Sequence, residues 1–183
     1  MHRKSLAISF LLIISLLLVG FSGLAQQKGG TLTIASGQNF IDLNPMVSDS
    51  AYDVYVINQI FDELVTLHPE TLEPAPYVAK SWEFSEDQSE ITFHIREGIK
   101  FHNGEELTAE DVAFTFNWII NPENHSKVRS QYDWLKEAKV LDEYTVKLIE
   151  KEEVSPYAPA LVYANIGIVP KDTFQEMGRD KFN

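Results

Sequence analysis

The sequence predicts an α/β protein, because helix-like and strand-like hydrophobic spacings alternate along it. In residues 112–119 apolar side chains recur every three or four positions, which is typical of one buried helix face. In residues 91–95 and 144–148 apolar and polar side chains alternate, as they do in strands with one buried face. The chain is long enough for these elements to bury one ordinary core.

The amino-terminal half adds a strand, a loop and a helix to this pattern. Residues 31–35, after a pair of glycines, are expected to form a short strand. A loop follows through residue 45. Residues 54–64 carry apolar side chains at intervals of three and four, which predicts a helix capped by a residue of segment 48–50.

Two further helices and one strand are expected later in the chain. Thr108 is a good helix N-cap, and Asp111 stands three residues on, where it completes a capping box. This helix should end at residues 121–122, because proline disfavours helical backbone before it. Residues 166–168 suggest a strand, and residues 171–177 suggest a helix.

The histidines raise the question of a metal or catalytic site. We expect a hairpin between residues 91–95 and 99–102, joined by a loop of residues 96–98. This hairpin would place His94 and His102 on its polar face, about 7–8 Å apart as diagonal neighbours. A metal would need a third ligand nearby, so we interpret both histidines as surface residues and expect no metal site.

The first 25 residues have the pattern of a secretory signal peptide. A basic start precedes an uncharged apolar run of 14 residues, Leu6 to Val19, and Gly23-Leu24-Ala25 supplies a cleavage site. The run is shorter than the ~20 residues that span a bilayer, so we expect cleavage after Ala25 and no membrane span afterwards. The chain has no cysteine, which excludes disulfides and attachment as a lipoprotein.

Charge excludes some partners. Without residues 1–25 the chain has 27 acids against 13 bases, a net charge of −14. This balance argues against binding to nucleic acid or to anionic lipid. The simplest interpretation of the acidity is a solvated surface.

No sequence motif for catalysis is found. Gly-x-Ser-x-Gly, His-Glu-x-x-His and phosphate-binding glycine loops are all missing. A secreted hydrolase with two catalytic carboxylates stays open as an alternative, but among 27 acids a chance pair is uninformative. Phe40 stands in a polar loop after the first expected strand, where ligand contacts are common.

The order of several segments resembles the family 5 solute-binding proteins of ABC importers. This class includes oligopeptide-, dipeptide- and nickel-binding proteins, and some members bind oligosaccharides. The segments that carry the resemblance are GGTLTIA, IDLNP, YDVYVINQIFDELVTL, LEPAPYVAKSWEFSEDQSEITFHIREGIKFHNGEELTAEDVAFTFNWI, YTVKLIE and IVPKDTF. The segment from Leu72 to Trp118 resembles the signature region of the family.

The resemblance implies a periplasmic-binding-protein-like (type 2) α/β fold, with two lobes and a ligand cleft between them. Residues 26–45 would begin the first lobe, and residues 46–165 would form an inserted α/β domain. Residues 166–183 would return to the first lobe. The chain would then be the amino-terminal part of a longer protein. The expected strands 31–35 and 166–168 would leave their apolar faces exposed.

The resemblance also implies capture of a peptide or an oligosaccharide and its delivery to the permease subunits of an ABC importer. The protein would be a periplasmic or secreted monomer, without enzymatic activity and without a cofactor. A nickel complex as ligand stays open, as does the alternative of a secreted hydrolase for carbohydrate or peptide.

The same resemblance places the loop before residue 45 at the cleft. Gln38, Asn39 and Phe40 are therefore the expected ligand-binding residues of this chain. Phe40 can stack on a ligand, and the two amides can donate and accept hydrogen bonds.

Overall fold

The computed structural model describes residues 30–151 and 166–182, which form two units divided between Ala35 and Ser36. In the first unit, residues 31–35 form no strand, and Leu32 and Ile34 are 83% and 79% exposed. The expected strand at 31–35 is therefore wrong. A strand needs a partner for its backbone hydrogen bonds, and no strand of the described residues pairs with this segment.

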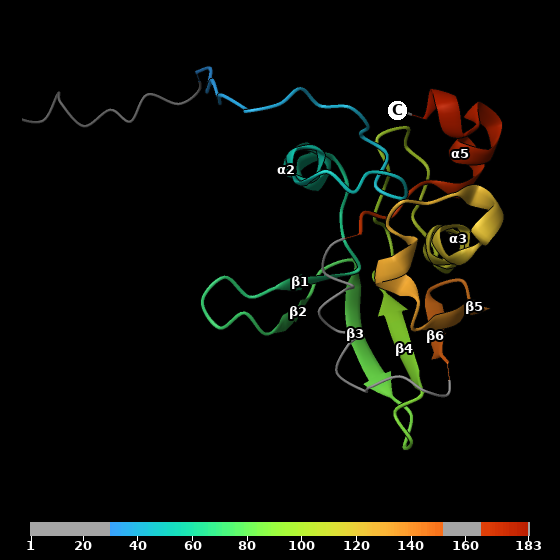
Figure 1. The fold of residues 1–183 in the computed structure, drawn as a ribbon. Coiled ribbons are helices and arrows are strands. Elements are labelled where there is room, and N and C mark those ends of the chain that lie inside the picture. The colour runs from blue at the N-terminus through green and yellow to red at the C-terminus, as the bar shows by residue number, and fades with distance from the viewer. Residues whose placement is uncertain (1–29, 152–165, 183) are drawn as a thin grey trace, which may run out of the picture. The chain divides into compact units, whose positions relative to one another are not determined.

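The second unit is built on a four-stranded antiparallel sheet in the order β3-β4-β6-β5 (Figure 1). The strands span Ala79–Phe84 (β3), Glu90–Ile95 (β4), Leu135–Asp142 (β5) and Thr145–Glu150 (β6). The central strands β4 and β6 show the expected alternation. Their buried apolar side chains are Ile91, Phe93, Ile95, Val146 and Leu148.

The expected hairpin after β4 is wrong. Strand β3 pairs with one edge of β4 and strand β6 pairs with the other, so residues 99–102 find no free edge. Lys100 instead forms a short bridge with Glu106. Only the turn geometry is confirmed, because Gly98 has a φ of 77°, in the left-handed region.

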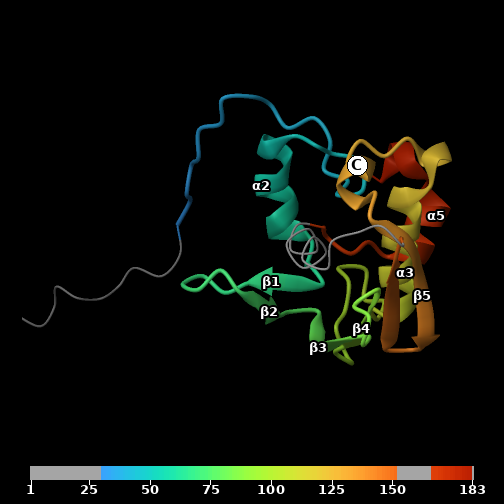
Figure 2. The same cartoon turned by 60° about the horizontal axis from the view of Figure 1, so that its bottom comes forward.

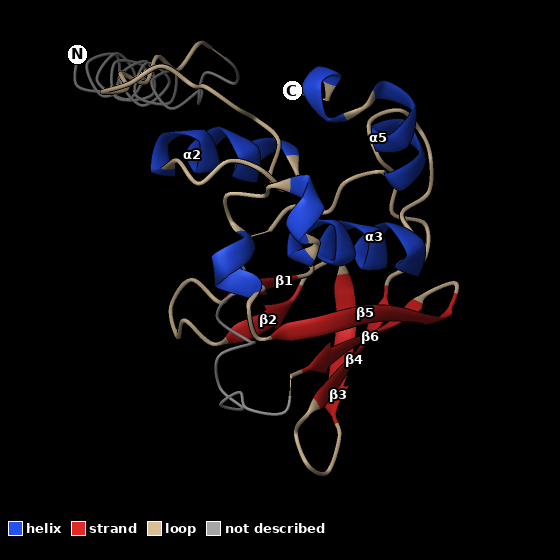
Figure 3. Cartoon of the chain, turned by 45° about the vertical axis from the view of Figure 1, so that its right-hand side comes forward, coloured by secondary structure: helices blue, strands red, loops and turns tan. Residues whose placement is uncertain are grey.

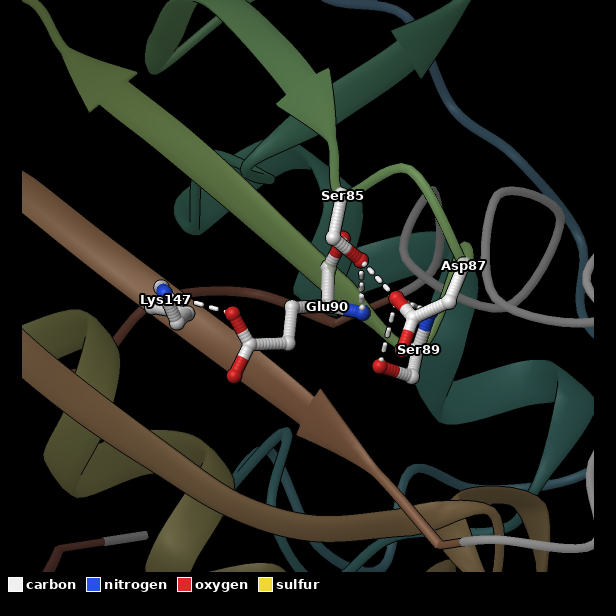
Figure 4. A network of polar contacts seen from close by, with 5 residues as sticks. All are labelled: Ser85, Asp87, Ser89, Glu90 and Lys147. Atoms are coloured by element: carbon white, nitrogen blue, oxygen red, sulfur yellow. Dashed lines mark hydrogen bonds and ion pairs between the residues drawn. The ribbon is translucent and has the colours of Figure 1, made fainter.

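The turn between β3 and β4 is held by a network of hydroxyl and carboxylate groups (Figure 4). The Ser85 and Ser89 hydroxyls donate to one oxygen of Asp87 at 2.7 and 2.9 Å. The hydrogen bond from Ser85, followed by those from Ser89, lowers the pKa of Asp87. At the start of β4, Glu90 forms an ion pair with Lys147 of β6.

Helix α3 (Ala109–Ile120) covers one face of this sheet and lies between the sheet and helix α5 (Lys171–Met177) (Figure 3). The expected capping box of Thr108 and Asp111 is present, and the helix ends at Ile120 with Asn121 as its C-cap, next to the expected end at residues 121–122. The predicted helix face is buried. Its fully buried side chains are Val112, Phe116 and Ile119.

Segment 166–168 forms only a single bridge, between Gly167 and Glu63, where a strand was expected. Ile166 and Ile168 are 2% and 1% exposed, so the expectation of an exposed apolar face was wrong for them. Both pack into the core that the sheet and α3 share. A Cβ on Gly167 would lie 2.3 Å from the Cβ of Phe61, so the two backbones can approach only because residue 167 is glycine.

Helix α2 (Ala51–Ile60) begins after Ser50, within the expected cap segment, but ends before residue 64. The C-cap residue, Phe61, has an extended backbone conformation. The chain then continues into a separate hairpin of β1 (Val65–Leu67) and β2 (Pro74–Pro76). In the described part of the chain, the short 3₁₀ helices are η1 (Pro122–Asn124), η2 (Arg129–Tyr132) and η4 (Arg179–Lys181). No helix in the described ranges has the length and apolar character needed to cross a bilayer.

Candidate functional site

The loop that precedes α2 carries the three predicted ligand-binding residues, Gln38, Asn39 and Phe40 (Figure 2). All three are exposed, and Phe40 keeps 51% of its surface exposed. The turn is closed locally, because the Ser36 hydroxyl donates to the carbonyl oxygen of Gln38 at 2.7 Å. The Phe40 ring is therefore available for contact with a ligand.

Asp53 anchors the end of this loop to α2. Its carboxylate accepts hydrogen bonds from the backbone N–H groups of Ile41 and Asp42 at 3.0 and 3.2 Å, and from the Ser48 hydroxyl at 2.7 Å. Asp53 is only 1% exposed. Burial alone would raise its pKa, but the bonds from Ser48, Ile41 and Asp42, with the charge of Lys127, leave the pKa of Asp53 lowered. The loop is thus fixed by a buried, ionised carboxylate.

A pocket of about 340 Å³ opens on another side of α2 and is called the α2 pocket below. It lies between the segment that enters α2, the helix itself, η2 and residue 166. Its lining residues are Pro45, Ser48, Asp49, Ala51, Val54, Tyr55, Ile57, Val128, Gln131, Tyr132 and Ile166. This volume falls at the lower end of the ~300–1,000 Å³ typical of small-molecule pockets.

The α2 pocket combines an apolar wall with a few exposed polar groups. Asp49 and Gln131 are exposed and can pair with donors of a ligand, and the Tyr55 ring is 74% exposed. Among the residues that the structure describes, no lysine, arginine or histidine lines the pocket. Its electrostatics therefore favour a neutral or cationic group over an anion.

The structure does not bring the predicted loop residues into this pocket. On α2, Ala51 and Tyr55 line the pocket. Tyr52 and Asp53, which lie between them in the sequence, contact the loop instead. At about 100° per residue, Asp53, two positions from both Ala51 and Tyr55, lies on the opposite side of α2 from them. Gln38, Asn39 and Phe40 are not among the pocket's lining residues.

Sequence reasoning missed the pocket residues. Asp49 was considered only as a possible helix cap, and Tyr55 was assigned no role. The one available signal was Tyr55, an aromatic residue on the side of the predicted helix opposite Ile57, where polar residues are usual.

A second acidic group follows the end of α2. Burial, and then the neighbouring carboxylate of Asp62, raise the pKa of Glu63 to about 7. Asp62 accepts a hydrogen bond from the Tyr77 hydroxyl at 2.8 Å. Burial, and then the negative charge of Glu63, raise the pKa of Tyr132. This group is a partly buried acid beside a second acid.

The two histidines lie on different elements. His94, on β4, is opposite Ser81 and Thr145, and its Nε2 lies 3.8 Å from a carboxylate oxygen of Glu83. His102 is exposed in the turn beyond β4. Within residues 30–151 and 166–182, no three histidine, aspartate or glutamate side chains are grouped to hold a metal ion.

The sequence matches the family described as bacterial extracellular solute-binding proteins, family 5 Middle, over residues 73–182. The dipeptide-binding protein of Escherichia coli (strain K12) is 29% identical over 189 residues, covering 93% of this chain and 35% of the relative. The oligopeptide-binding protein OppA of Bacillus subtilis (strain 168) is 28% identical over 166 residues, covering 81% of this chain and 30% of the relative. The chain thus spans about a third of the length of these relatives.

Solved structures agree with this similarity. The binding protein MoaA of A. tumefacien R10, in complex with mannopinic acid, superposes with a TM-score of 0.68 at 26% identity. That match covers 77% of this chain and 29% of MoaA. NikZ of Campylobacter jejuni, in complex with Ni(L-His), superposes with a TM-score of 0.64 at 27% identity, covering 75% of this chain and 27% of NikZ.

Proposed function

We propose that this chain, which belongs to family 5 of the bacterial extracellular solute-binding proteins, is part of the ligand-capturing component of an ABC importer. The relatives named above bind dipeptides, oligopeptides, mannopinic acid or Ni(L-His). None of them is a hydrolase, so the alternative of a secreted hydrolase has no support among them. The ligand class we favour here is a peptide, with an oligosaccharide as the second candidate.

The α2 pocket is the observation that carries this proposal. A peptide offers a cationic amino group, which pairs with the exposed carboxylate of Asp49, and amide donors for the carbonyl of Gln131. Its side chains can pack on Val54 and Tyr55. An oligosaccharide lacks the cationic group and would use only the hydrogen bonds and the ring of Tyr55.

The partners and location follow from this function. We propose export directed by residues 1–25, cleavage after Ala25, and a monomer outside the inner membrane that delivers its ligand to the permease subunits. We keep the division into residues 26–45 and 166–183 as parts of one lobe, and residues 46–165 as an inserted domain. Because binding proteins of this kind close two lobes around a ligand, the present chain alone should bind weakly.

The test is a titration of the full chain with the dipeptide Ala-Leu, which has no aromatic ring, and with maltotriose, followed by NMR of backbone amides. We expect Ala-Leu to shift the amides of residues 48–55 and 128–132, with a Kd on the order of 1 mM. Tyr55→Ala should weaken binding by about 1–3 kcal/mol through the loss of apolar contact. Asp49→Asn should weaken binding of Ala-Leu and leave binding of maltotriose unchanged.

Phe40→Ala tests whether the predicted loop contributes to binding in addition to the α2 pocket. If the loop also contacts the ligand, this variant should lose about 1–3 kcal/mol of binding free energy. His102→Ala is the control and should change binding by less than about 0.5 kcal/mol. Shifts confined to residues outside 36–55 and 128–132, or no shifts from either ligand with folded protein, would contradict the proposed site.

A further inference from the structure

A second pocket, of about 230 Å³, lies at the carboxyl end of α2 and is called the Phe182 pocket below. It is formed by residues 60–62, the turn 99–103, Leu107, segment 168–173 and Phe182. Three phenylalanines, Phe61, Phe101 and Phe182, are among its lining residues. None of its residues lines the α2 pocket, so the two pockets are separate sites.

The walls of the Phe182 pocket are held by specific contacts. The ring centroids of Phe61 and Phe182 are 6.3 Å apart, and Phe182 packs edge-on against Phe174 at 5.0 Å. The Asn103 amide donates to the Thr173 hydroxyl at 2.7 Å and so joins the turn to α5. The backbone N–H of Ile168 donates to the carbonyl of Asp62 at 3.0 Å. The pocket is therefore preformed.

The polar groups at its rim are not equally available. The carboxylate of Asp62 accepts the Tyr77 hydroxyl, and the Asn103 amide is shared between Glu105 and Thr173. Lys100, by contrast, is exposed, and its ammonium forms no ion pair or hydrogen bond within the described residues. Its charge acts on the carboxylate of Glu106 without forming an ion pair with it. Lys100 therefore leaves an ammonium at this rim that can pair with an anionic group of a ligand, beside the negative charge that Asp62 keeps while it accepts the Tyr77 hydroxyl.

We propose that the Phe182 pocket binds a small molecule with one aromatic ring and one carboxylate, with the ring among the phenylalanines and the carboxylate toward Lys100. The volume is below the ~300–1,000 Å³ of pockets for larger ligands, which suits a single ring. Aromatic rings pack on one another in tilted and edge-on geometries, as those of Phe61, Phe174 and Phe182 already do. This site is independent of the proposed capture of peptides.

The test uses three probes with the same ring: phenylacetate, benzyl alcohol and phenethylamine. Titrated into the full chain and followed by NMR, phenylacetate should shift the amides of residues 99–103 and 168–173, with a Kd of about 0.1–1 mM. Benzyl alcohol should bind about tenfold more weakly, and phenethylamine more weakly still. Lys100→Gln should reduce phenylacetate to the affinity of benzyl alcohol, whereas Lys136→Gln, on the exposed side of β5, should change nothing.

Ile60→Trp provides an independent check, because Ile60 stands at the edge of the pocket and is 39% exposed. The larger side chain should fill the space and abolish binding of all three probes while the amide spectrum stays dispersed. Equal binding of phenylacetate and phenethylamine, unchanged binding in Lys100→Gln, or shifts at the α2 pocket instead would overturn the proposal. The absence of binding to folded protein would overturn it as well.

Discussion

Helices α2 and α3 each carry an aspartate at the third position after the N-cap, and the two side chains accept hydrogen bonds from different parts of the chain. In α3, Asp111 accepts the backbone N–H of its own cap residue, Thr108, at 2.9 Å, and the N–H of Lys171 at 2.8 Å. In α2, the side chain of the cap residue Ser50 makes no cap bond. Asp53 reaches back instead to the loop that precedes the helix, and it is more deeply buried, at 1% exposure against 8% for Asp111.

The difference shows that position along a helix does not by itself determine the role of a charged side chain. A capping box needs only Thr108, Asp111 and the local backbone, so its spacing is visible in the sequence. The Asp53 cluster needs the chain to fold back over α2, so that Ile41, Asp42 and Ser48 converge on one carboxylate. Four predictions test this contrast.

Asp53→Ala should have the largest effect. It leaves two backbone N–H groups and the Ser48 hydroxyl without their acceptor in a buried site, which should lower the free energy of unfolding by about 2–4 kcal/mol. Urea unfolding at pH 7 measures this, and faster amide exchange at Ile41 and Asp42 should accompany it. Asp49→Ala, at an exposed carboxylate nearby, is the matched control and should stay within about 0.5 kcal/mol. Equal effects of the two variants would contradict the anchoring role.

The same cluster predicts a pH dependence. Because the pKa of Asp53 is lowered in the folded chain, its stabilising contribution is present above the ordinary pKa of 3.8 and is lost as the pH falls through the folded value. Asp53→Asn removes this titration. The difference in unfolding free energy between wild type and Asp53→Asn should therefore be largest near pH 6 and shrink below pH 3.8. A constant difference from pH 6 to pH 3 would exclude the ionised anchor.

Asp111→Ala should cost about 2 kcal/mol, because it removes both the capping box and the acceptor for the Lys171 N–H. We expect faster amide exchange at Lys171 and unchanged amide exchange in the loop before α2. This result would separate the role of Asp111 from that of Asp53. If the cost matched that of Thr108→Ala, the bond to Lys171 would contribute nothing.

The smallest effects are expected at the two caps themselves. Thr108→Ala should cost about 1 kcal/mol through the loss of its cap bond to α3. Ser50→Ala should cost less than about 0.5 kcal/mol, because its side chain makes no cap bond. Thermal unfolding of both variants decides this, and a larger loss in Ser50→Ala would reverse the contrast between the helices.

Elements with a strong local period were predicted correctly. Helix α3 and the inward faces of β4 and β6 follow the expected ranges, because burial of one face imposes a period of 3.6 or 2 on the sequence. Helix α5 also spans the expected residues, although Phe174 is its one buried residue. Strand β5 was missed, since irregularities at both of its ends break the alternation. The hairpin after β4 was wrong because strand pairing is decided by distant residues, here those of β3 and β6.

The candidate site was harder to predict than the fold. Gln38, Asn39 and Phe40 were chosen from the resemblance and from their position in a polar loop, and they remain a prediction. The α2 pocket joins residues 45–57 to residues 128–132 and 166. These segments are far apart in the sequence and carry no common motif, so only the folded chain brings Asp49, Tyr55 and Gln131 to one place.

The sequence by itself determined the α/β class, the position and caps of α3, the buried faces of β4 and β6, and the resemblance that led to family 5. The caps and the buried faces depend on residues within about one helix turn or one strand of each other, where backbone geometry sets the spacing. The class and the resemblance depend on the order of such local segments along the chain. Only the tertiary structure decided the strand order, the burial of Ile166 and Ile168, the use of Asp53 as an anchor and the two pockets. These depend on contacts between distant segments, which the free energy of packing selects and which no local pattern records.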